Sequence, residues 1–328
     1  MEQTRLSVLL PNYNNGPYLK EALESLFAQT YSNFIIYFVD DCSTDDSISI
    51  AESYSDERLV IIKKRQNSGI VDTMNVALDR IETEYYVRLD GDDISTPDRF
   101  ETLVNFMDEH PEIGVCSSSI ETFGIESKVM DFEKDPQLNR ANLIFGHSIG
   151  HASSIFRTAV MKTNKISYVD RFWRLEDYYL FYRLKDVTLT TAIPNKFYLY
   201  RQAAYNNNDE ITQRKNLAFK EFYKMVLTDL GVAITEKNLS AHLQLNNREK
   251  TTFGLKDYRN HIQLLCGANK KSLLYPVVEL DLILKKYMEK ICYRLIDQKK
   301  VGIMQLIGLG MRNKALVKYY FATRFGKK

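Results

Sequence analysis

The sequence predicts an α/β protein with a mostly parallel central sheet, followed by a helical C-terminal region. Strand patterns alternate with helix patterns through roughly the first 90 residues, which is typical of a parallel sheet built from βαβ units. Beyond Arg201 the apolar residues recur at helical spacing instead. The polar stretch 205–209 separates these two patterns and predicts two domains, residues 1–205 and residues 206–328.

The first two predicted strands flank a helix. Residues 5–11 form the first strand, and Asn14-Asn15-Gly16 then turns the chain. Pro17 suits the first turn of a helix, which continues with apolar residues at helical spacing: Leu19, Ala22, Leu23, Leu26 and Phe27. Residues 34–40 form the second strand, and Asp41 follows it.

Two further strands complete this part. The polar cluster 43–46 is placed to cap the next helix, and residues 59–62 form a short third strand. Residues 67–69 lead into a helix whose apolar positions are Val71, Met74, Ala77, Leu78 and Ile81. Residues 84–89 form the fourth strand.

The ends of these strands predict a crevice that holds phosphates. Ligands of open α/β sheets bind outside the carboxyl ends of the strands, where Pro11, Asp41 and Asp90 all lie. The first turn, residues 11–16, has no GxGxxG, and the chain has no Walker A sequence. A protein that holds phosphates without a glycine loop needs a metal ion to do so.

Three aspartates directly after the fourth strand could bind that ion. Asp90, Asp92 and Asp93 lie within four positions, and carboxylates this close repel one another and raise one another's pKa. Their oxygen atoms suit Mg²⁺ or Mn²⁺. The alternative is an acidic turn that caps a helix beginning near Pro97. The cluster alone leaves both interpretations open.

Composition predicts a soluble globular protein. Of 328 residues, 45% are hydrophobic and 26% are charged. The N-terminus shows no secretory signal, and the four cysteines form no CxxC, so we expect a cytoplasmic protein without a zinc site or a disulfide framework. The net charge of +2 hides an uneven distribution. Residues 285–328 contain 12 Lys and Arg against two acidic residues.

Taken together, the motifs of residues 5–200 resemble those of the inverting glycosyltransferases of family 2, which have the GT-A fold. The matching segments follow in the same order and spacing: residues 6–14, 25–31, 39–45, 67–69 with Asn75, and 90–93. At Cys42 relatives usually carry a small residue such as Gly, Asn or Ser.

The resemblance implies roles for individual residues. Tyr13 would offer a face for the nucleobase to stack on, although a partly buried loop aromatic is the alternative. Asp41 would accept a hydrogen bond from the uracil imide of a UDP-sugar, and Asp90 and Asp92 would face ribose, metal and diphosphate. The implied nucleotide site comprises Pro11, Tyr13, Asn14, Asp41, Asn67, Gly69, Asn75, Asp90, Gly91 and Asp92. The implied ligands of Mn²⁺ or Mg²⁺ are Asp92, Asp90, Asp93 and His151.

A second acidic pair, Glu176 and Asp177, opens an amphipathic segment. Acids in a first helical turn are favourable against the helix dipole, which is the ordinary explanation. The resemblance instead implies that Asp177 is the catalytic base and that Glu176 orients it or the acceptor. Attack by a neutral hydroxyl needs such a base, and single displacement would invert the anomeric carbon.

Other polar residues are candidates with less support. His151 lies in residues 150–157, which resemble the His-containing strand of the family, and it is a candidate contact for diphosphate or metal. His147 is the alternative histidine. Arg174 and Arg201 are candidate phosphate partners.

The C-terminal tail is basic and partly apolar. Residues 301–311 are apolar but too short to span a bilayer, which needs about 20 residues. Residues 285–328 therefore suit either the surface of an anionic membrane or a packed helix with a basic face. The C-terminal region is also a candidate to cover the acceptor side of the site or to mediate self-association. No nucleic-acid motif accompanies the basic residues.

The sequence thus predicts a metal-dependent inverting glycosyltransferase. It would move sugar from a UDP-sugar to a hydroxyl of a glycan or lipid-linked acceptor in surface polysaccharide synthesis, in the cytoplasm or peripherally on the inner membrane face. The alternatives are a sugar-nucleotide nucleotidyltransferase, which usually has a Gly-rich first loop, and a noncatalytic glycan-binding protein on a transferase fold.

Overall fold

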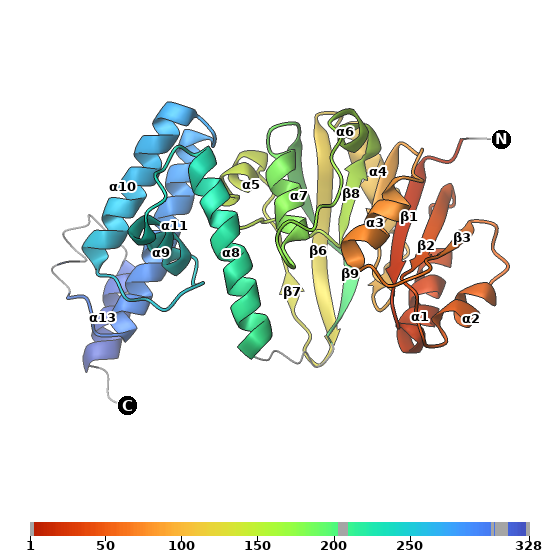
Figure 1. Cartoon of the computed structure of the whole chain (residues 1–328), viewed down its shortest axis with the longest axis horizontal. Coiled ribbons are helices and arrows are strands. Elements are labelled where there is room, and N and C mark those ends of the chain that lie inside the picture. Colours follow the sequence, from red (N-terminus) through yellow and green to blue (C-terminus); the bar gives the residue numbers. More distant parts are fainter. Residues whose placement is uncertain (1–2, 203–208, 303–304, 306–313, 326–328) are drawn as a thin grey trace. The chain divides into compact units, whose positions relative to one another are not determined.

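The computed structural model describes residues 3–202, 209–302, 305 and 314–325 (Figure 1). The chain divides into two compact units, residues 1–206 and residues 207–328. Each unit is described by itself below. The first contains a β-sheet with helices, and the second is helical.

The N-terminal half of the sheet is parallel. It consists of β1 (Leu6–Asn12), β2 (Phe34–Asp40), β3 (Leu59–Lys63) and β4 (Tyr85–Arg88). β1 lies between β2 and β4, and β3 pairs with the outer side of β2. All four strands were predicted to within two residues at each end. Their carboxyl ends lie at one edge of the sheet, as expected for parallel neighbours.

The second half makes the sheet mixed rather than mostly parallel. The added strands are β5 (Ile94–Ser95), β6 (Ile113–Gly124), β7 (Val129–Met130), β8 (Ser154–Arg157) and β9 (Leu189–Gln202). The order is β3-β2-β1-β4-β8-β6-β9-β5, with β7 on β6. β8 runs antiparallel to both β4 and β6, while β6 and β9 are parallel. The βαβ pattern of the first 90 residues carries no information on these later pairings.

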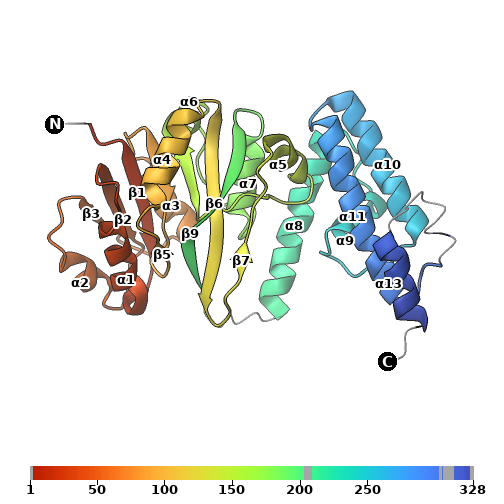
Figure 2. The ribbon, with the colours of Figure 1, turned by 180° about the vertical axis from the view of Figure 1, so that it is seen from behind.

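Helices cover both faces of the sheet (Figures 1 and 2). α1 (Gly16–Phe27) and α4 (Arg99–Glu109) cover one face, and α3 (Ile70–Leu78) and α7 (Glu176–Leu184) lie on the other. Alternate residues of β1 point to opposite faces, so Leu6, Val8 and Leu10 join the core beneath α1 and α4. The remaining helices are α2 (Ser47–Glu52), α5 (Pro136–Asn142) and α6 (Thr158–Thr163).

The capping of α2 by residues 43–46 differs in detail from the prediction. Asp46 precedes α2 but its side chain makes no capping hydrogen bond. Asp45 accepts from Ser47 N at 3.0 Å and from Gly16 N at 2.8 Å. One carboxylate therefore satisfies backbone donors at the start of both α1 and α2, because the loops after β1 and β2 lie side by side.

The second unit contains α8 (Asp209–Asp229), α9 (Glu236–Leu245), α10 (Leu255–Ser272), α11 (Val277–Asp297) and α13 (Lys314–Phe325). Apolar residues recur at helical spacing from Leu273 to Leu295, which predicts one helix over this range. The helix begins only at Val277, because Leu273 ends α10 in the left-handed conformation. Most of the apolar segment 301–311 and of the polar stretch 205–209 lies outside the described residues. Within the described ranges, no helix is long and apolar enough to cross a bilayer.

Candidate active site

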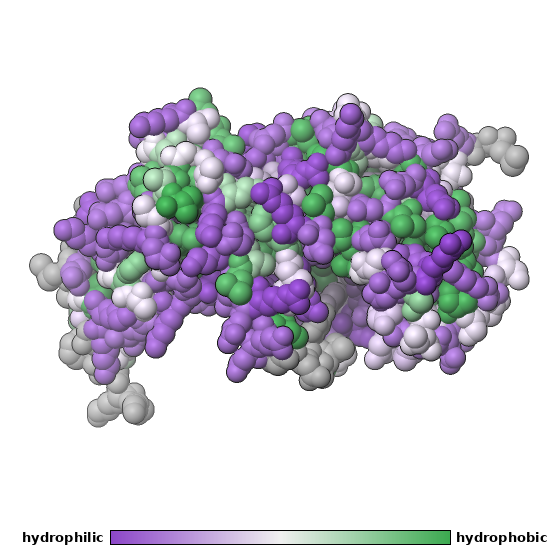
Figure 3. Space-filling view, in the orientation of Figure 1, coloured by the Kyte–Doolittle hydropathy of each residue, from purple (hydrophilic) through white to green (hydrophobic). Residues whose placement is uncertain are grey.

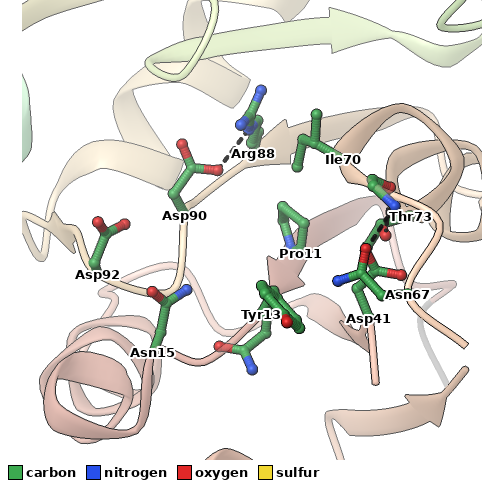
Figure 4. A pocket seen from close by; sticks show the side chains of 12 residues that line it. Pro11, Tyr13, Asn15, Asp41, Asn67, Ile70, Thr73, Arg88, Asp90 and Asp92 are labelled. Atoms are coloured by element: carbon green, nitrogen blue, oxygen red, sulfur yellow. Dashed lines mark hydrogen bonds and ion pairs between the residues drawn. The ribbon is translucent and has the colours of Figure 1, made fainter. Parts of the chain in front are cut away.

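A cavity of about 410 Å³ lies at the carboxyl ends of β1, β2 and β4 (Figure 4). Asp90 and Asp92 stand on one side of it, and Asp41 and Asn67 stand on the other. Its lining consists of Pro11, Asn12, Tyr13, Asn15, Asp41, Asn67, Gly69, Ile70, Thr73, Arg88, Asp90 and Asp92. The structure thus brings together most of the residues that the sequence assigned to nucleotide binding.

Two of the predicted residues shape the cavity without lining it. Asn14, at a φ of 54°, accepts from Thr44 N at 2.8 Å and joins the loops after β1 and β2. Gly91 packs closely against two side chains. A Cβ atom there would stand 2.8 Å from Asn12 Oδ1 and 2.9 Å from Asn15 Nδ2. Only glycine fits this position without movement of the asparagines.

Asn75, also predicted for nucleotide binding, contacts another loop. Its Nδ2 donates to Tyr168 O at 2.9 Å, and its Oδ1 accepts from Tyr168 N at 3.0 Å. This amide therefore fixes the segment that leads into α7. It is absent from the cavity lining.

Asp41 is held by donors from the start of α3. Oδ1 accepts from Ser68 N at 3.0 Å and Oδ2 from Gly69 N at 2.8 Å, while Lys64 Nζ lies 2.6 Å from Oδ1. Gly69 has a φ of 85°, which a residue with a side chain rarely adopts. A carboxylate oxygen accepts up to two hydrogen bonds, so Oδ2 retains capacity for a ligand donor.

Arg88 is a cavity residue that the motif analysis missed. Its Nε donates to Asp90 Oδ1 at 2.7 Å, and both side chains line the cavity. Arg88 precedes Asp90 by two positions, which places both on one side of an extended chain. This two-residue spacing could have identified Arg88 as a cavity residue from the sequence. Asn12, Asn15, Ile70 and Thr73 were also missed, and each lies within three positions of a predicted residue.

Asp93 faces away from Asp90 and Asp92. Its Oδ2 accepts from Tyr198 Oη at 2.6 Å and its Oδ1 from Arg201 N at 2.7 Å. Burial, then the charge of Asp90, raises the pKa of Asp93 to about 8. The Arg201 side chain donates to Asp92 O at 2.8 Å and to Glu21 at 2.6 Å. Both residues therefore hold the aspartate turn against β9 in this structure.

His151 has both ring nitrogens occupied. Nδ1 lies 2.9 Å from Arg88 Nη1, and Nε2 lies 2.9 Å from Tyr168 Oη. Because a guanidinium only donates, Nδ1 must be the acceptor and Nε2 must carry the proton. Burial and the Arg88 charge lower the pKa of His151 to about 3. The predicted metal ligands Asp93 and His151 are thus engaged elsewhere.

Asp90 and Asp92 remain the residues that fit a divalent ion. Across the described residues, no group of three or more His, Cys, Asp or Glu side chains is placed to hold a metal. Mg²⁺ in phosphate sites is commonly held by one or two carboxylates, with phosphate oxygens supplying further ligands. Burial and the charge of Asp90 raise the pKa of Asp92, which a bound cation would counteract.

The acidic pair opens α7. Asp177 Oδ2 lies 3.1 Å from His147 Nε2, and Asp177 Oδ1 accepts from Tyr178 N at 2.6 Å. Burial raises the pKa of Glu176, and the Asp177 charge raises it further, whereas the charge of Arg88 lowers it. Glu176 is therefore within electrostatic range of a residue that lines the cavity. Arg174, exposed at a φ of 55°, lies against Trp173 with its guanidinium 4.9 Å from the ring centroid.

Residues 7–205 match the family model described as glycosyl transferase family 2. The chain belongs to this family. A relative in Haemophilus influenzae, described as an uncharacterized glycosyltransferase, is 26% identical over 76% of this chain and 83% of its own length. Poly(ribitol-phosphate) beta-N-acetylglucosaminyltransferase TarS of Staphylococcus aureus is 29% identical over 53% of this chain and 31% of its own length.

Solved structures confirm the GT-A fold for this family 2 glycosyltransferase. TarS 1-349 of S. aureus, in complex with UDP, has a TM-score of 0.59 at 20% identity and covers 88% of this chain and 91% of that chain. A mannosyltransferase, PcManGT from Pyrobaculum calidifontis in complex with GDP-Man and Mn²⁺, has a TM-score of 0.54 at 13% identity. It covers 100% of this chain and 89% of that chain.

Proposed function

We propose that this glycosyltransferase moves a sugar from a UDP-sugar to a hydroxyl of a glycan or lipid-linked acceptor, with inversion, in surface polysaccharide synthesis. The cavity carries the proposal. It joins an exposed aromatic ring, a carboxylate held by backbone donors, and a carboxylate pair suited to a divalent ion.

The donor nucleotide is assigned to the side of the cavity formed by Tyr13 and Asp41. Tyr13 lines the cavity and is 48% exposed, which leaves ring surface on which a base could stack. Asp41 accepts hydrogen bonds through Oδ2, which suits the imide N–H of uracil. Cytosine presents an acceptor at the equivalent ring nitrogen, so the same carboxylate disfavours it.

The diphosphate is assigned to the opposite side, beside Arg88, Asp90 and Asp92. Asp90 and Asp92 would hold Mn²⁺ or Mg²⁺, which would neutralise the charge that develops on the leaving diphosphate. Arg88 contributes a fixed positive charge at the same place, already oriented by Asp90. We assign proton removal from the acceptor hydroxyl to Asp177, with Glu176 beside it. Transfer in a single displacement would invert the anomeric carbon.

The relatives support the class of product. GgaB of Bacillus subtilis is described as a minor teichoic acid biosynthesis protein and is 31% identical over 46% of this chain and 18% of its own length. TarS 1-349 has also been solved in complex with UDP-GlcNAc. A UDP-activated sugar and a cell-surface polymer are therefore the first substrates to test.

Calorimetric titration with UDP, in Mn²⁺ and in EDTA, tests the donor site. We expect binding in Mn²⁺ that weakens about tenfold or more in EDTA, since a lost metal–phosphate contact of about 1.4 kcal/mol suffices for that change. Asp92→Asn should remove the metal dependence, while Asp177→Asn should leave UDP binding intact and abolish transfer. Folded protein that does not bind UDP would contradict the proposal.

We further propose that the C-terminal unit contacts anionic membranes. Apolar side chains are exposed on its helices, and Figure 3 shows hydrophobic groups at the surface over α10 and α11. Those on and between α10 and α11 are Leu264, Leu273, Val277, Val278 and Leu282, and Tyr319 and Phe321 are exposed on α13. The excess of basic residues over 285–328 complements an anionic surface. Flotation with anionic liposomes should fall for a chain ending at Gln298, and equal partitioning of both chains would contradict the proposal.

A further inference from the structure

His147 occupies a position that fixes its protonation state. Its Nδ1 lies 2.8 Å from the carbonyl oxygen of Ile149, and its Nε2 lies 3.1 Å from Asp177 Oδ2. A carbonyl and an ionised carboxylate accept hydrogen bonds but donate none. Each nitrogen therefore needs its own proton, and the ring is an imidazolium facing an ionised Asp177.

Beside an ionised Asp177, neither neutral tautomer satisfies this geometry. A proton on Nδ1 alone would leave a nitrogen lone pair facing the Asp177 carboxylate, and a proton on Nε2 alone would leave one facing the Ile149 carbonyl. Burial by itself would lower the pKa of His147, but the charge and hydrogen bond of Asp177 outweigh burial and raise it. Burial likewise opposes ionisation of Asp177, yet the charge of His147 holds its pKa well below the usual range.

The surroundings hold both partners in place. The His147 ring lies 5.3 Å from the Phe181 ring and 6.0 Å from the Tyr178 ring, centroid to centroid. Tyr178 Oη donates to Leu143 O at 2.7 Å, which ties the segment before His147 to α7. The second oxygen of Asp177 accepts from the Tyr178 backbone. Each oxygen of the carboxylate therefore has a fixed donor.

We propose that His147 is the positioning residue of the acceptor base: it keeps Asp177 ionised and turned toward the acceptor hydroxyl. The inference rests on the proposed function, in which Asp177 takes that proton. In the step, the acceptor O–H bond breaks and its proton passes to Asp177. The acceptor oxygen bonds to the anomeric carbon, and the anomeric bond to the diphosphate breaks with its electron pair on the diphosphate. His147 keeps both of its protons.

Two amide substitutions separate this role from a structural one. The side-chain nitrogen of asparagine takes the place of Nδ1, so His147→Asn preserves the bond to Ile149 and removes the one to Asp177. The side-chain nitrogen of glutamine takes the place of Nε2, so His147→Gln preserves the bond to Asp177 and removes the one to Ile149. The two variants are controls for each other.

The assay is release of UDP from UDP-GlcNAc with water as acceptor in Mn²⁺, beside calorimetric binding of UDP. We expect His147→Asn to lower kcat about tenfold or more. This is a part of the rate acceleration of about 10²–10⁴-fold that a positioned base contributes. The Kd for UDP should be unchanged, and His147→Gln should stay within about threefold of the wild-type kcat. A larger loss in His147→Gln than in His147→Asn would overturn the proposal, as would two variants with wild-type kcat.

A spectroscopic measurement tests the ion pair without turnover. In ¹⁵N-histidine spectra at pH of about 7, wild-type His147 should carry protons on both nitrogens, and Asp177→Asn should convert it to the neutral ring. A neutral His147 in the wild type would overturn the inference. If the wild type failed to bind UDP, the proposed function would fail, and these spectra would still decide whether the pair exists.

Discussion

Asp92 and Asp93 are adjacent in the chain, yet their side chains have different surroundings. Asp92 lines the cavity, whereas Asp93 is 1% exposed and accepts from Tyr198 and from the backbone of Arg201. A turn sends neighbouring side chains in different directions, so the motif spacing could not tell which carboxylate faces a ligand. Asp93 holds the turn in place, and Asp90 and Asp92 on the same turn line the cavity.

Asn75 supplies a prediction at this scale. Asn75→Ala should lower the free energy of unfolding by about 1–3 kcal/mol, because it leaves the amide and carbonyl of Tyr168 without their partner. UDP binding should be unchanged, since Asn75 is absent from the cavity lining. Urea unfolding and calorimetry measure the two effects.

The matched control is Asn67→Ala. Asn67 is exposed and lines the cavity, so this change should weaken UDP binding with little loss of stability. Weakened UDP binding by Asn75→Ala at unchanged stability would contradict the assignment and restore the nucleotide role implied by the sequence.

The sequence could predict that residues at the strand ends line the cavity, but it could not predict the hydrogen-bond partners of the site residues. Pro11 lies near the end of β1, and Asp41 and Asp90 follow β2 and β4. The carboxyl ends of these parallel strands meet at one edge of the sheet. His151 gave no comparable signal. Its engagement by Arg88 and Tyr168 joins residues 63 and 17 positions away, which no local pattern encodes.

At the scale of elements, the junction of α10 and α11 shows where helical periodicity misleads. Leu273 continues the apolar spacing of the following segment, but it ends α10 at a φ of 52° with its side chain 67% exposed. Pro276 then precedes α11. Spacing alone could not separate a helix end from a helix start, although proline after the break is a usual boundary signal.

Leu273→Gly should stabilise this junction. Glycine adopts the left-handed conformation without the strain of a Cβ atom, so we expect a gain of about 0.5–1 kcal/mol in the free energy of unfolding. Ser272→Gly is the control. Its position is the last of the helix, where glycine should destabilise by about 0.5–1 kcal/mol. Urea unfolding, monitored by the circular dichroism of the helices, measures both changes. A loss of stability in Leu273→Gly would contradict the presence of backbone strain at Leu273.

The later strands define the limit of prediction at this scale. The first four strands follow one another through helices, and their alternating pattern predicted their approximate bounds and their parallel direction. β8 is antiparallel to both of its neighbours and lies between two strands that are distant in sequence. Its apolar run is compatible with either direction.

At the scale of the molecule, each unit has its own buried groups. The C-terminal unit encloses two histidines, with His261 Nε2 lying 3.4 Å from His242 Nδ1. His261 is 3% exposed, and burial lowers its pKa to about 4. The folded unit therefore contains a neutral ring that the unfolded chain protonates at a pKa near 6.5.

This unit should lose stability in acid. The pKa of His261 is lower in the folded chain than in the unfolded chain, so its neutral ring adds stability that is fully present above about pH 6.5. This stability is lost as the pH falls toward about 4, by about 3 kcal/mol for a shift of this size. Urea unfolding followed by far-ultraviolet circular dichroism at several pH values measures the loss. The His261→Gln variant has no titrating ring at this position, so it should lose less stability in acid than the wild type. An equal loss of stability in both proteins would contradict the prediction.

The division at residues 206/207 has an evolutionary consequence. Every residue assigned to the nucleotide, the metal or the acceptor base lies before it, while the exposed apolar helices lie after it. If the C-terminal unit contacts membranes as proposed, natural selection could change the membrane binding of the enzyme through one unit and its sugar transfer through the other. On this proposal, exchange of the C-terminal unit between relatives should yield chimaeras that keep the transfer reaction and differ in membrane binding.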